Sequence, residues 1–209
     1  MRRARSEDAK DERRQLLLSA ALDEFFERGF SAARIEDIAQ RASLSKGTVY
    51  LYFDSKEALF LALIEDLATP NIEQIEQIAA AAPSLREALD RLAVFAPVMI
   101  RTSNLPRLMK VLIGDSHTFP DIIRDYRKQK IERILGALTA FLDRAVDRGE
   151  IPPQNTSLTA RLILAPIVLS GMWQAVFGRD ADAEIDLEAL FRLHTDLLLK
   201  ALSPEGTKS

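Results

Sequence analysis

The chain has 209 residues, of which 47% are hydrophobic and 28% are charged, and its formal net charge is −3 at pH 7. This composition is typical of a soluble globular protein with a sizeable core, and it excludes a protein that coats nucleic acid with its whole surface. Cysteine is absent, which excludes disulfide bonds and thiol chemistry, and the charged N-terminus precedes no signal-peptide core. A cytoplasmic location is therefore expected.

Helical periodicity runs through nearly the whole chain, and no stretch alternates as a half-buried strand would. The apolar stripes place helices at about 17–28, 35–42, 46–52, 55–69, 84–101, 108–113, 119–148, 158–178 and 185–202. Gly29 ends the first of these, Asp54 or Ser55 can cap the fourth, and Pro70 is expected to end it. The prediction is an all-α fold, with an N-terminal three-helix domain at residues 1–54 and a larger helical bundle at residues 55–209.

The most apolar stretch, residues 162–177, raises the question of a membrane span. Pro166, Ser170 and Gly171 interrupt it, and arginines flank it closely on both sides. A spanning helix needs about 20 consecutive apolar residues. We therefore expect a buried helix, and no membrane partner.

Two short helices joined by a tight turn, packed on a preceding amphipathic helix, are the layout of a helix-turn-helix. The second short helix contains Gly47 and the β-branched residues Thr48 and Val49, a poor composition for a helix selected only for stability. Val49 is expected to face inward. A small residue and hydroxyl groups near the start of a helix suit one that enters a DNA groove and contacts phosphate oxygens.

The segment 25–64, FFERGFSAARIEDIAQRASLSKGTVYLYFDSKEALFLALI, closely resembles the DNA-binding region of the tetracycline-repressor (TetR) family of bacterial transcription regulators. The matching residues are Gly29, Phe30, Ile38, Ala39, Ala42, Ser45, Gly47, Thr48, Val49, Tyr50, Phe53, Ser55, Lys56, Glu57, Ala58 and Leu59. The resemblance implies a helix-turn-helix DNA-binding domain and a C-terminal helical region that dimerises and binds a small ligand. It also implies that ligand binding shifts the spacing of the two recognition helices and so releases the DNA.

Two positions depart from the family pattern. The family commonly has Thr or Ser just before the second helix, where the hydroxyl caps that helix and contacts a phosphate, but here the residue is Ala33. Ser31 and Arg34 are the nearby substitutes. Ser43 stands where the family often has a glycine in the turn, and serine suits turns.

The predicted partner is a palindromic double-stranded DNA operator. The predicted DNA contacts are Arg34, Ser45, Lys46, Gly47, Thr48, Tyr50, Tyr52 and Lys56. For Tyr50 and Tyr52, phosphate contact is favoured over a core position, whereas Phe53 is expected in the core. The basic arm at residues 2–5 is either a further DNA contact or a solvated tail.

A homodimer is expected because one short recognition helix reads too few base pairs for useful specificity. The last two helices are the predicted interface, since one carries small residues that permit close approach and the other a wide apolar stripe. The predicted contacts are Ala165, Gly171, Ala175, Leu187, Leu190, Phe191, His194, Leu197 and Leu198. The alternative is that these residues form the core of a monomer.

A pocket for an unidentified small apolar effector is expected near Pro97 and Pro166, because each proline bends its helix and leaves space beside it. The predicted lining is Phe95, Met99, Arg101, Met109, Ile113, His117, Tyr126 and Trp173. The polar members would anchor the ligand. Each apolar member would serve equally well as a core residue.

No enzymatic activity is predicted. Asp115, Ser116 and His117 are consecutive and so cannot form a hydrolase triad, and neither histidine has carboxylates at metal-ligand spacing, so no metal or cofactor is predicted. The sequence predicts a bacterial TetR-like regulator that binds its operator as a homodimer and is released by a small apolar ligand. The resemblance implies that it is a repressor, as members of this family usually are. The alternative is a helical ligand-binding or interaction protein of the same fold that binds no operator.

Overall fold

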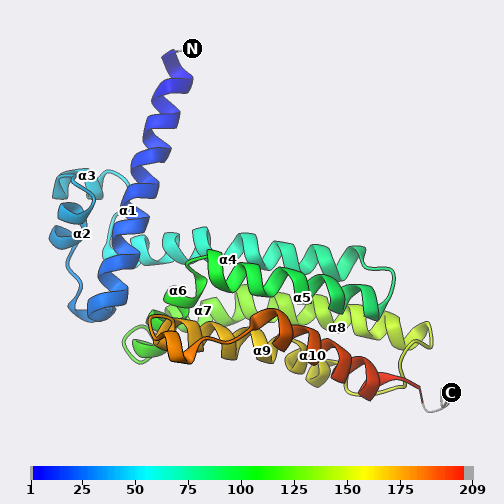
Figure 1. The fold of residues 1–209 in the computed structure, drawn as a ribbon. Coiled ribbons are helices and arrows are strands. Elements are labelled where there is room, and N and C mark those ends of the chain that lie inside the picture. Colours follow the sequence, from blue (N-terminus) through cyan, green and yellow to red (C-terminus); the bar gives the residue numbers. More distant parts are fainter. Residues whose placement is uncertain (1, 205–209) are drawn as a thin grey trace. The chain divides into compact units, whose positions relative to one another are not determined.

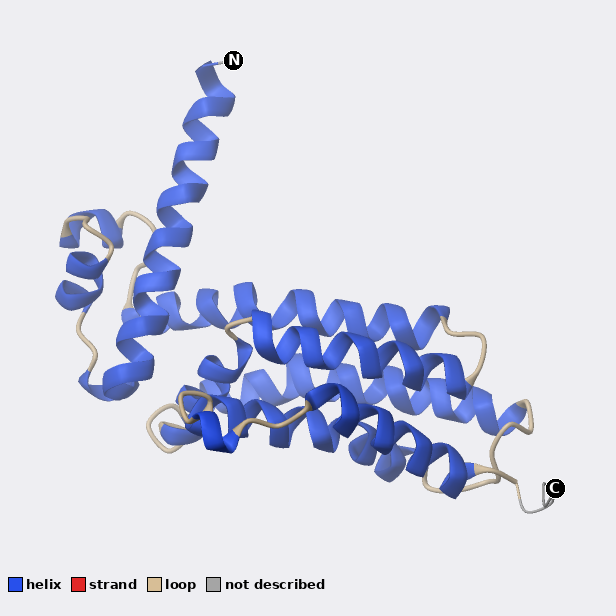
Figure 2. Cartoon of the chain, viewed as in Figure 1, coloured by secondary structure: helices blue, strands red, loops and turns tan. Residues whose placement is uncertain are grey.

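The computed structural model describes the backbone of residues 2–204 and the side chains of residues 8–204. Across this part of the chain, helices and loops alternate and there is no strand (Figure 1, Figure 2). The predicted all-α class is therefore confirmed. The basic arm at residues 2–5 belongs to the first helix, but its side chains lie outside the described residues.

The elements follow one another along the chain as α1 (Arg2–Ala32), α2 (Ile35–Arg41), α3 (Lys46–Tyr50), α4 (Lys56–Ala81), α5 (Leu85–Thr102), α6 (Leu105–Gly114), α7 (Pro120–Tyr126), a π-helical turn (Arg127–Ile131), α8 (Glu132–Asp147), α9 (Thr156–Phe177), a 3₁₀ turn (Ala181–Ala183) and α10 (Leu187–Leu202). The regular part of α1 ends at Gly29, as predicted. That residue has a φ of 78°, a left-handed conformation that glycine adopts without a steric penalty.

Pro70 does not end the fourth helix, contrary to the expectation. α4 continues through it as far as Ala81. Four apolar residues of α4 near or after the proline are buried: Ala68, Ile72, Ile75 and Ile78. Most helical stability in proteins comes from packing of an apolar face, so this packing outweighs the single backbone hydrogen bond that proline removes.

The chain divides into two compact units, each made of two segments of sequence. The first unit comprises Met1–Leu67 and Arg107–Ile123, and the second comprises Ala68–Pro106 and Arg124–Ser209. This division differs from the boundary expected after residue 54, because the first turns of α4 and most of α6 belong to the first unit.

The core of the first unit explains why a distant segment belongs to it. Phe30, Phe60 and Phe119 form a cluster in which the ring centroids lie 4.9 to 5.1 Å apart. These rings come from three separate parts of the chain, and all are buried. Residues 107–123 therefore complete a core that residues 1–67 begin.

In the second unit, α5 packs against α9 and α10, and α8 packs against α9 (Figure 1). The side chains of Ser84 and Asp186 cap α5 and α10 by accepting hydrogen bonds from backbone N–H groups in their first turns. One core cluster joins Ala96, Met99 and Ile100 of α5 to Leu187 and Phe191 of α10.

Candidate nucleic-acid interface

α3 is fixed to its unit by a buried side chain and a helix cap. Val49 is fully buried, which confirms that it faces inward. The Ser45 hydroxyl accepts a hydrogen bond from the Thr48 N–H at 3.0 Å and lies 2.8 Å from the Thr48 hydroxyl. Because so short a helix has few internal hydrogen bonds, this cap is an important part of its stability.

The outward side of α3 carries the residues that were predicted to contact DNA. Lys46 and Gly47 are exposed, and Tyr50 is 46% exposed. Tyr52, just after the helix, is half-buried with its ring centroid 6.4 Å from that of Phe53. Phe53 itself is buried, which confirms its expected place in the core.

Gly47 has free space around it. A Cβ atom built at this position would find its nearest neighbour, the Ser45 hydroxyl oxygen, at 3.7 Å, an ordinary van der Waals distance. The φ of this residue is not in the left-handed region that requires glycine. The folded chain alone therefore gives no reason for a glycine here.

Lys56, one of the predicted DNA contacts, has a structural role in this unit. Its Nζ donates hydrogen bonds to the carbonyl oxygens of Phe30, Ser31 and Ala33 at 2.7, 3.3 and 3.0 Å. An ammonium group has three N–H donors, and these carbonyls occupy all of them. The structure thus assigns Lys56 to residues 29–34, which we call the α1–α2 connection.

Two residues of the segment after α6 bind the other side of the α1–α2 connection. The carboxylate of Asp115 accepts a hydrogen bond from the Phe30 N–H at 2.9 Å, and the Ser31 and Thr118 hydroxyls lie 3.2 Å apart. Ser31 therefore does not cap α2, and Arg34, at the N-cap position, makes no capping hydrogen bond with its side chain. Neither substitute therefore replaces the missing cap of α2, and a phosphate contact by Ser31 or Arg34 stays a prediction.

Charged residues tie α2 to α1. The fully buried carboxylate of Glu24 lies 2.7 Å from Arg41 Nε and 3.1 Å from Arg28 Nε. Arg41 also binds Glu27, and this hydrogen bond lowers the pKa of the Glu27 carboxyl. These ion pairs hold α2, and with it the turn before α3, against the long first helix.

A further ion pair connects α2 to α3. Lys46 Nζ lies 2.5 Å from Glu36 Oε1, and both side chains are more than half exposed. The hydrogen bond between them lowers the pKa of Glu36 and raises the pKa of Lys46, so both stay charged at neutral pH. The Lys46 ammonium also lies 5.8 Å from the centroid of the Tyr50 ring.

Sequence reasoning missed Leu51, which follows α3 directly and is 82% exposed. The signal was available: the buried residues Val49 and Phe53 are four positions apart, so a residue midway between them points away from the core. An exposed leucine beside the recognition helix can contact thymine methyl groups.

Apolar side chains lie exposed along α9, although the sequence predicted a buried helix. The large exposed apolar residues of α9 and α10 are Leu158, Leu162, Val168, Leu169, Met172, Trp173, Val176, Phe177, Leu193 and Leu197. Only 28% of the most apolar window of α9 is buried in the subunit. By length and composition α9 could also cross a membrane, a weak criterion that helices of soluble proteins meet as well.

The residues predicted for the dimer interface divide into two groups. Leu187 and Phe191 lie in the core of their own unit and Gly171 is buried, so these three offer no free surface. The others are exposed or half-buried: Ala165, Ala175, Leu190, His194, Leu197 and Leu198. Burial lowers the pKa of His194, because an apolar surrounding disfavours the charged imidazole.

The predicted effector-pocket residues are divided between the two units. Met109, Ile113 and His117 belong to the first unit, and Met99 is buried in the core of the second. Tyr126 is half-buried, and this desolvation raises the pKa of its phenol.

Arg101 and Trp173 line a pocket of about 380 Å³ beside the end of α9, but both have partners there. The Arg101 guanidinium binds the Glu188 carboxylate with both amino groups, one of them at 2.8 Å. The Trp173 indole N–H donates to the Ala183 carbonyl at 2.7 Å. Neither group is an open anchor for a ligand.

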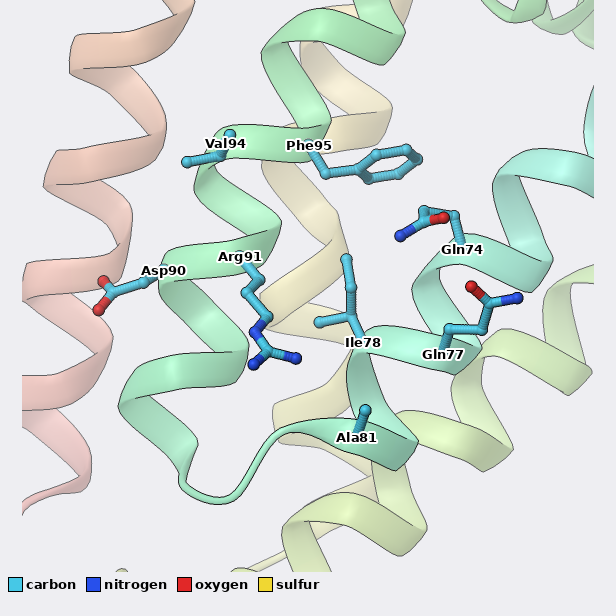
Figure 3. A pocket seen from close by; sticks show the side chains of 8 residues that line it. All are labelled: Gln74, Gln77, Ile78, Ala81, Asp90, Arg91, Val94 and Phe95. Carbon is cyan, nitrogen blue, oxygen red and sulfur yellow. The ribbon is translucent and has the colours of Figure 1, made fainter.

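Phe95 lines a groove of about 570 Å³ between α4 and α5. The other lining residues are Gln74, Gln77, Ile78, Ala81, Asp90, Arg91 and Val94. Figure 3 shows the Phe95 ring extending toward Gln74, with Ile78 between the two helices and Asp90 directed to the other side of α5. The groove combines an apolar floor with two amide groups on its edge, a combination that suits an amphipathic small molecule.

Comparisons with known proteins place the chain among DNA-binding regulators. ArpR of Pseudomonas putida, described as a probable HTH-type transcriptional regulator, is 27% identical over 184 residues, which are 83% of this chain and 85% of that protein. YvdT of Bacillus subtilis, another regulator of this type, is 43% identical over 60 residues, which are 29% of this chain and 31% of that protein. The structure is also similar to that of FadR from Bacillus subtilis in complex with stearoyl-CoA, with a TM-score of 0.62 and 21% identity over 90% of this chain and 98% of FadR.

Two family models match separate parts of the chain. Residues 17–63 match the bacterial regulatory proteins of the tetR family, and residues 79–185 match the tetracyclin repressor-like C-terminal domain. The first match contains the helix-turn-helix, and the second covers more than half of the chain. The chain therefore belongs to the TetR family of transcriptional regulators.

Proposed function

We propose that this regulator binds a palindromic operator as a homodimer, represses transcription there, and dissociates when a small molecule occupies its second unit. The observation that carries this proposal is the outward side of α3, where Lys46, Gly47 and Tyr50 are exposed on a helix fixed by Val49 and the Ser45 cap. Ammonium and hydroxyl groups can bind phosphate oxygens and base edges, and an exposed glycine lets the backbone approach the DNA closely.

The apolar side of α9 and α10 supports the homodimer. A large contiguous apolar patch on a soluble protein marks an interaction surface, and one such patch on each of two identical chains is self-complementary about a two-fold axis. Leu162, Leu169 and Val176 follow one another at seven-residue spacing and are all exposed. This spacing keeps them on one side of the helix, where a second copy can cover them.

The groove between α4 and α5 supports a small amphipathic effector. Its volume of about 570 Å³ is in the range of small-molecule sites. The related fold of FadR holds stearoyl-CoA, a ligand with a long apolar chain and a polar head. In the proposed mechanism, the effector binds one conformation of the dimer more tightly than the other, and this difference shifts the population away from the DNA-bound form.

Selection of bound sequences from random duplexes tests the proposed function. We expect enrichment of a palindrome, bound with an affinity that falls steeply as salt concentration rises. The double variant Lys46→Ala, Tyr50→Ala should weaken binding of the selected duplex by roughly 100-fold, whereas the control Arg86→Ala, at an exposed cation of α5, should not. If the double variant binds the selected duplex as tightly as the wild type, α3 is not the recognition helix. Failure to enrich any sequence would favour a helical ligand-binding protein without an operator.

A further inference from the structure

Glu36 differs from the other charged residues of α2 in the position of its partner. Asp37 lies 3.6 Å from Arg28 of α1, and Arg41 binds two carboxylates of α1. Glu36 instead lies 2.5 Å from Lys46, the first residue of α3. The first group of contacts joins α2 to the body of the unit, whereas the Glu36–Lys46 pair lies on the surface proposed to meet DNA.

Fold stability gives little reason for the Glu36–Lys46 pair. The side chains are 56% and 53% exposed, and ion pairs in water at a protein surface contribute little to stability. What the pair does change is the charge at the start of α3. The Glu36 carboxylate offsets the positive charge of the Lys46 ammonium there.

We propose that Glu36 is a specificity-determining residue, which keeps Lys46 paired on DNA of random sequence and releases it only where α3 fits its operator. This inference rests on the proposed function. Binding to random DNA depends almost wholly on cations that neutralise phosphates. A lysine that remains paired adds no such contact, and the phosphates repel the carboxylate beside it.

The operator complex offers this pair a different set of partners. With α3 seated in the major groove, the Lys46 ammonium reaches a guanine edge or a phosphate, and the Glu36 carboxylate can accept a hydrogen bond from a cytosine amino group. Each charge then exchanges its partner for one on the DNA. Specificity arises because the pair weakens binding to the competing sequences more than binding to the operator.

The test compares four proteins on two duplexes across a range of salt concentrations. The duplexes are the sequence selected by the wild type and a scrambled duplex of the same composition. The proteins are the wild type, Glu36→Gln, Asp37→Asn, and the double variant Glu36→Gln, Lys46→Gln. Asp37→Asn is the matched control, because it removes the same charge from the same helical turn but leaves α3 untouched.

For Glu36→Gln we expect the affinity for the scrambled duplex to rise about tenfold, since exposed pairs of modest strength are lost in both subunits. On the scrambled duplex, the slope of log affinity against log salt concentration should steepen by about two for the dimer, which is one unit for each lysine that the substitution frees. Affinity for the selected duplex should change less, so the ratio of the two affinities falls. Asp37→Asn should keep the wild-type slope, and the double variant should return to it.

Equal changes in Glu36→Gln and Asp37→Asn would overturn the inference, because net charge alone would then explain them. An unchanged slope in Glu36→Gln would overturn it as well. If the wild type enriches a palindrome while Glu36→Gln behaves like the wild type, the inference fails and the proposed function stands. If the wild type shows no salt-dependent binding to either duplex, both fail. Thermal melting followed by circular dichroism should give the same midpoint for all four folded proteins.

Discussion

α3 and α9 both leave side chains uncovered, but the chemistry of those side chains is opposite. α3 is short and a poor helix former, and it exposes a cation, a glycine and a phenol. α9 is long and strongly apolar, and it exposes leucine, valine and phenylalanine. The stability of one isolated chain explains neither surface, and each indicates a partner that matches it: phosphates and base edges for α3, and a second apolar surface for α9.

The largest effect is expected from a charge placed on α9. Leu169 is 64% exposed, and Leu169→Glu would bury two unpaired carboxylates in a symmetric dimer. We expect the dimer dissociation constant to rise by more than about 100-fold, measured by sedimentation equilibrium, with loss of palindrome binding. Leu61→Glu, at an exposed leucine of α4, is the control and should remain dimeric. A dimeric Leu169→Glu protein would place the interface elsewhere.

A smaller effect is expected from Lys56→Met. This variant tests whether the Lys56 ammonium stabilises the fold or contacts DNA. The variant leaves three carbonyl groups of the α1–α2 connection without their donor, so the free energy of unfolding should fall by about 1–3 kcal/mol in urea titrations. The salt dependence of DNA binding should not change. If stability is kept and the salt slope flattens, Lys56 contacts phosphate after all. For comparison, Lys110→Met removes a cation over the Phe26 ring, and it should lower the free energy of unfolding by about 0.5–1 kcal/mol.

Gly47→Ala should move stability and DNA affinity in opposite directions. Alanine is a better helix former and a Cβ fits here, so the free energy of unfolding should rise by up to about 1 kcal/mol. Operator affinity should fall, because the added methyl group occupies the space that the DNA backbone needs. Gly136→Ala in α8, where a Cβ would meet nothing within 4 Å, should give the stability gain alone. Unchanged operator affinity in Gly47→Ala would exclude close approach at this residue.

The smallest effect is expected for the exposed pair between α5 and α10. The hydrogen bond from Arg101 lowers the pKa of Glu188 to about 2, from an ordinary value of 4.5. A lowered folded-state pKa stabilises the protein above pH 4.5, and that stabilisation is lost as the pH falls from 4.5 to about 2. Glu188→Gln should therefore make the free energy of unfolding depend less on pH in this range. The difference from the wild type should be small, and high salt should remove it. Glu184→Gln is the control, and an identical flattening by both variants would argue against a specific pair.

The local features of the recognition helix could be predicted from the sequence. The break at Gly29, the inward position of Val49 and the core position of Phe53 depend on neighbours only a few residues away, and all three predictions are confirmed. The role of Lys56 could not be predicted in this way. Its carbonyl partners lie 23 to 26 residues earlier, and they come within reach only after the chain reverses at the α1–α2 connection.

The apolar stripes of α9 and α10 were visible in the sequence, but what covers them was not. Phe191 is buried against α5, whereas Leu193 and Leu197 on the same helix are exposed. Periodicity identifies the apolar side chains, but the side that faces the subunit core depends on where another helix lies. The same reason explains Pro70: its local signal ends a helix, and the burial of the residues around it keeps the helix intact.

The two-segment construction of the first unit has a consequence for how the regulator is made. The Phe30 N–H donates a hydrogen bond to the Asp115 carboxylate, which lies 85 residues later in the sequence. The aromatic cluster is incomplete until Phe119 is present. On the ribosome, α4 and α5 must therefore be synthesised before the helix-turn-helix can close its core, and such long-range contacts slow folding. A chain cut after residue 67 lacks both contacts. The unit proposed to read DNA is thus completed only after residues 68–106 of the second unit have been synthesised.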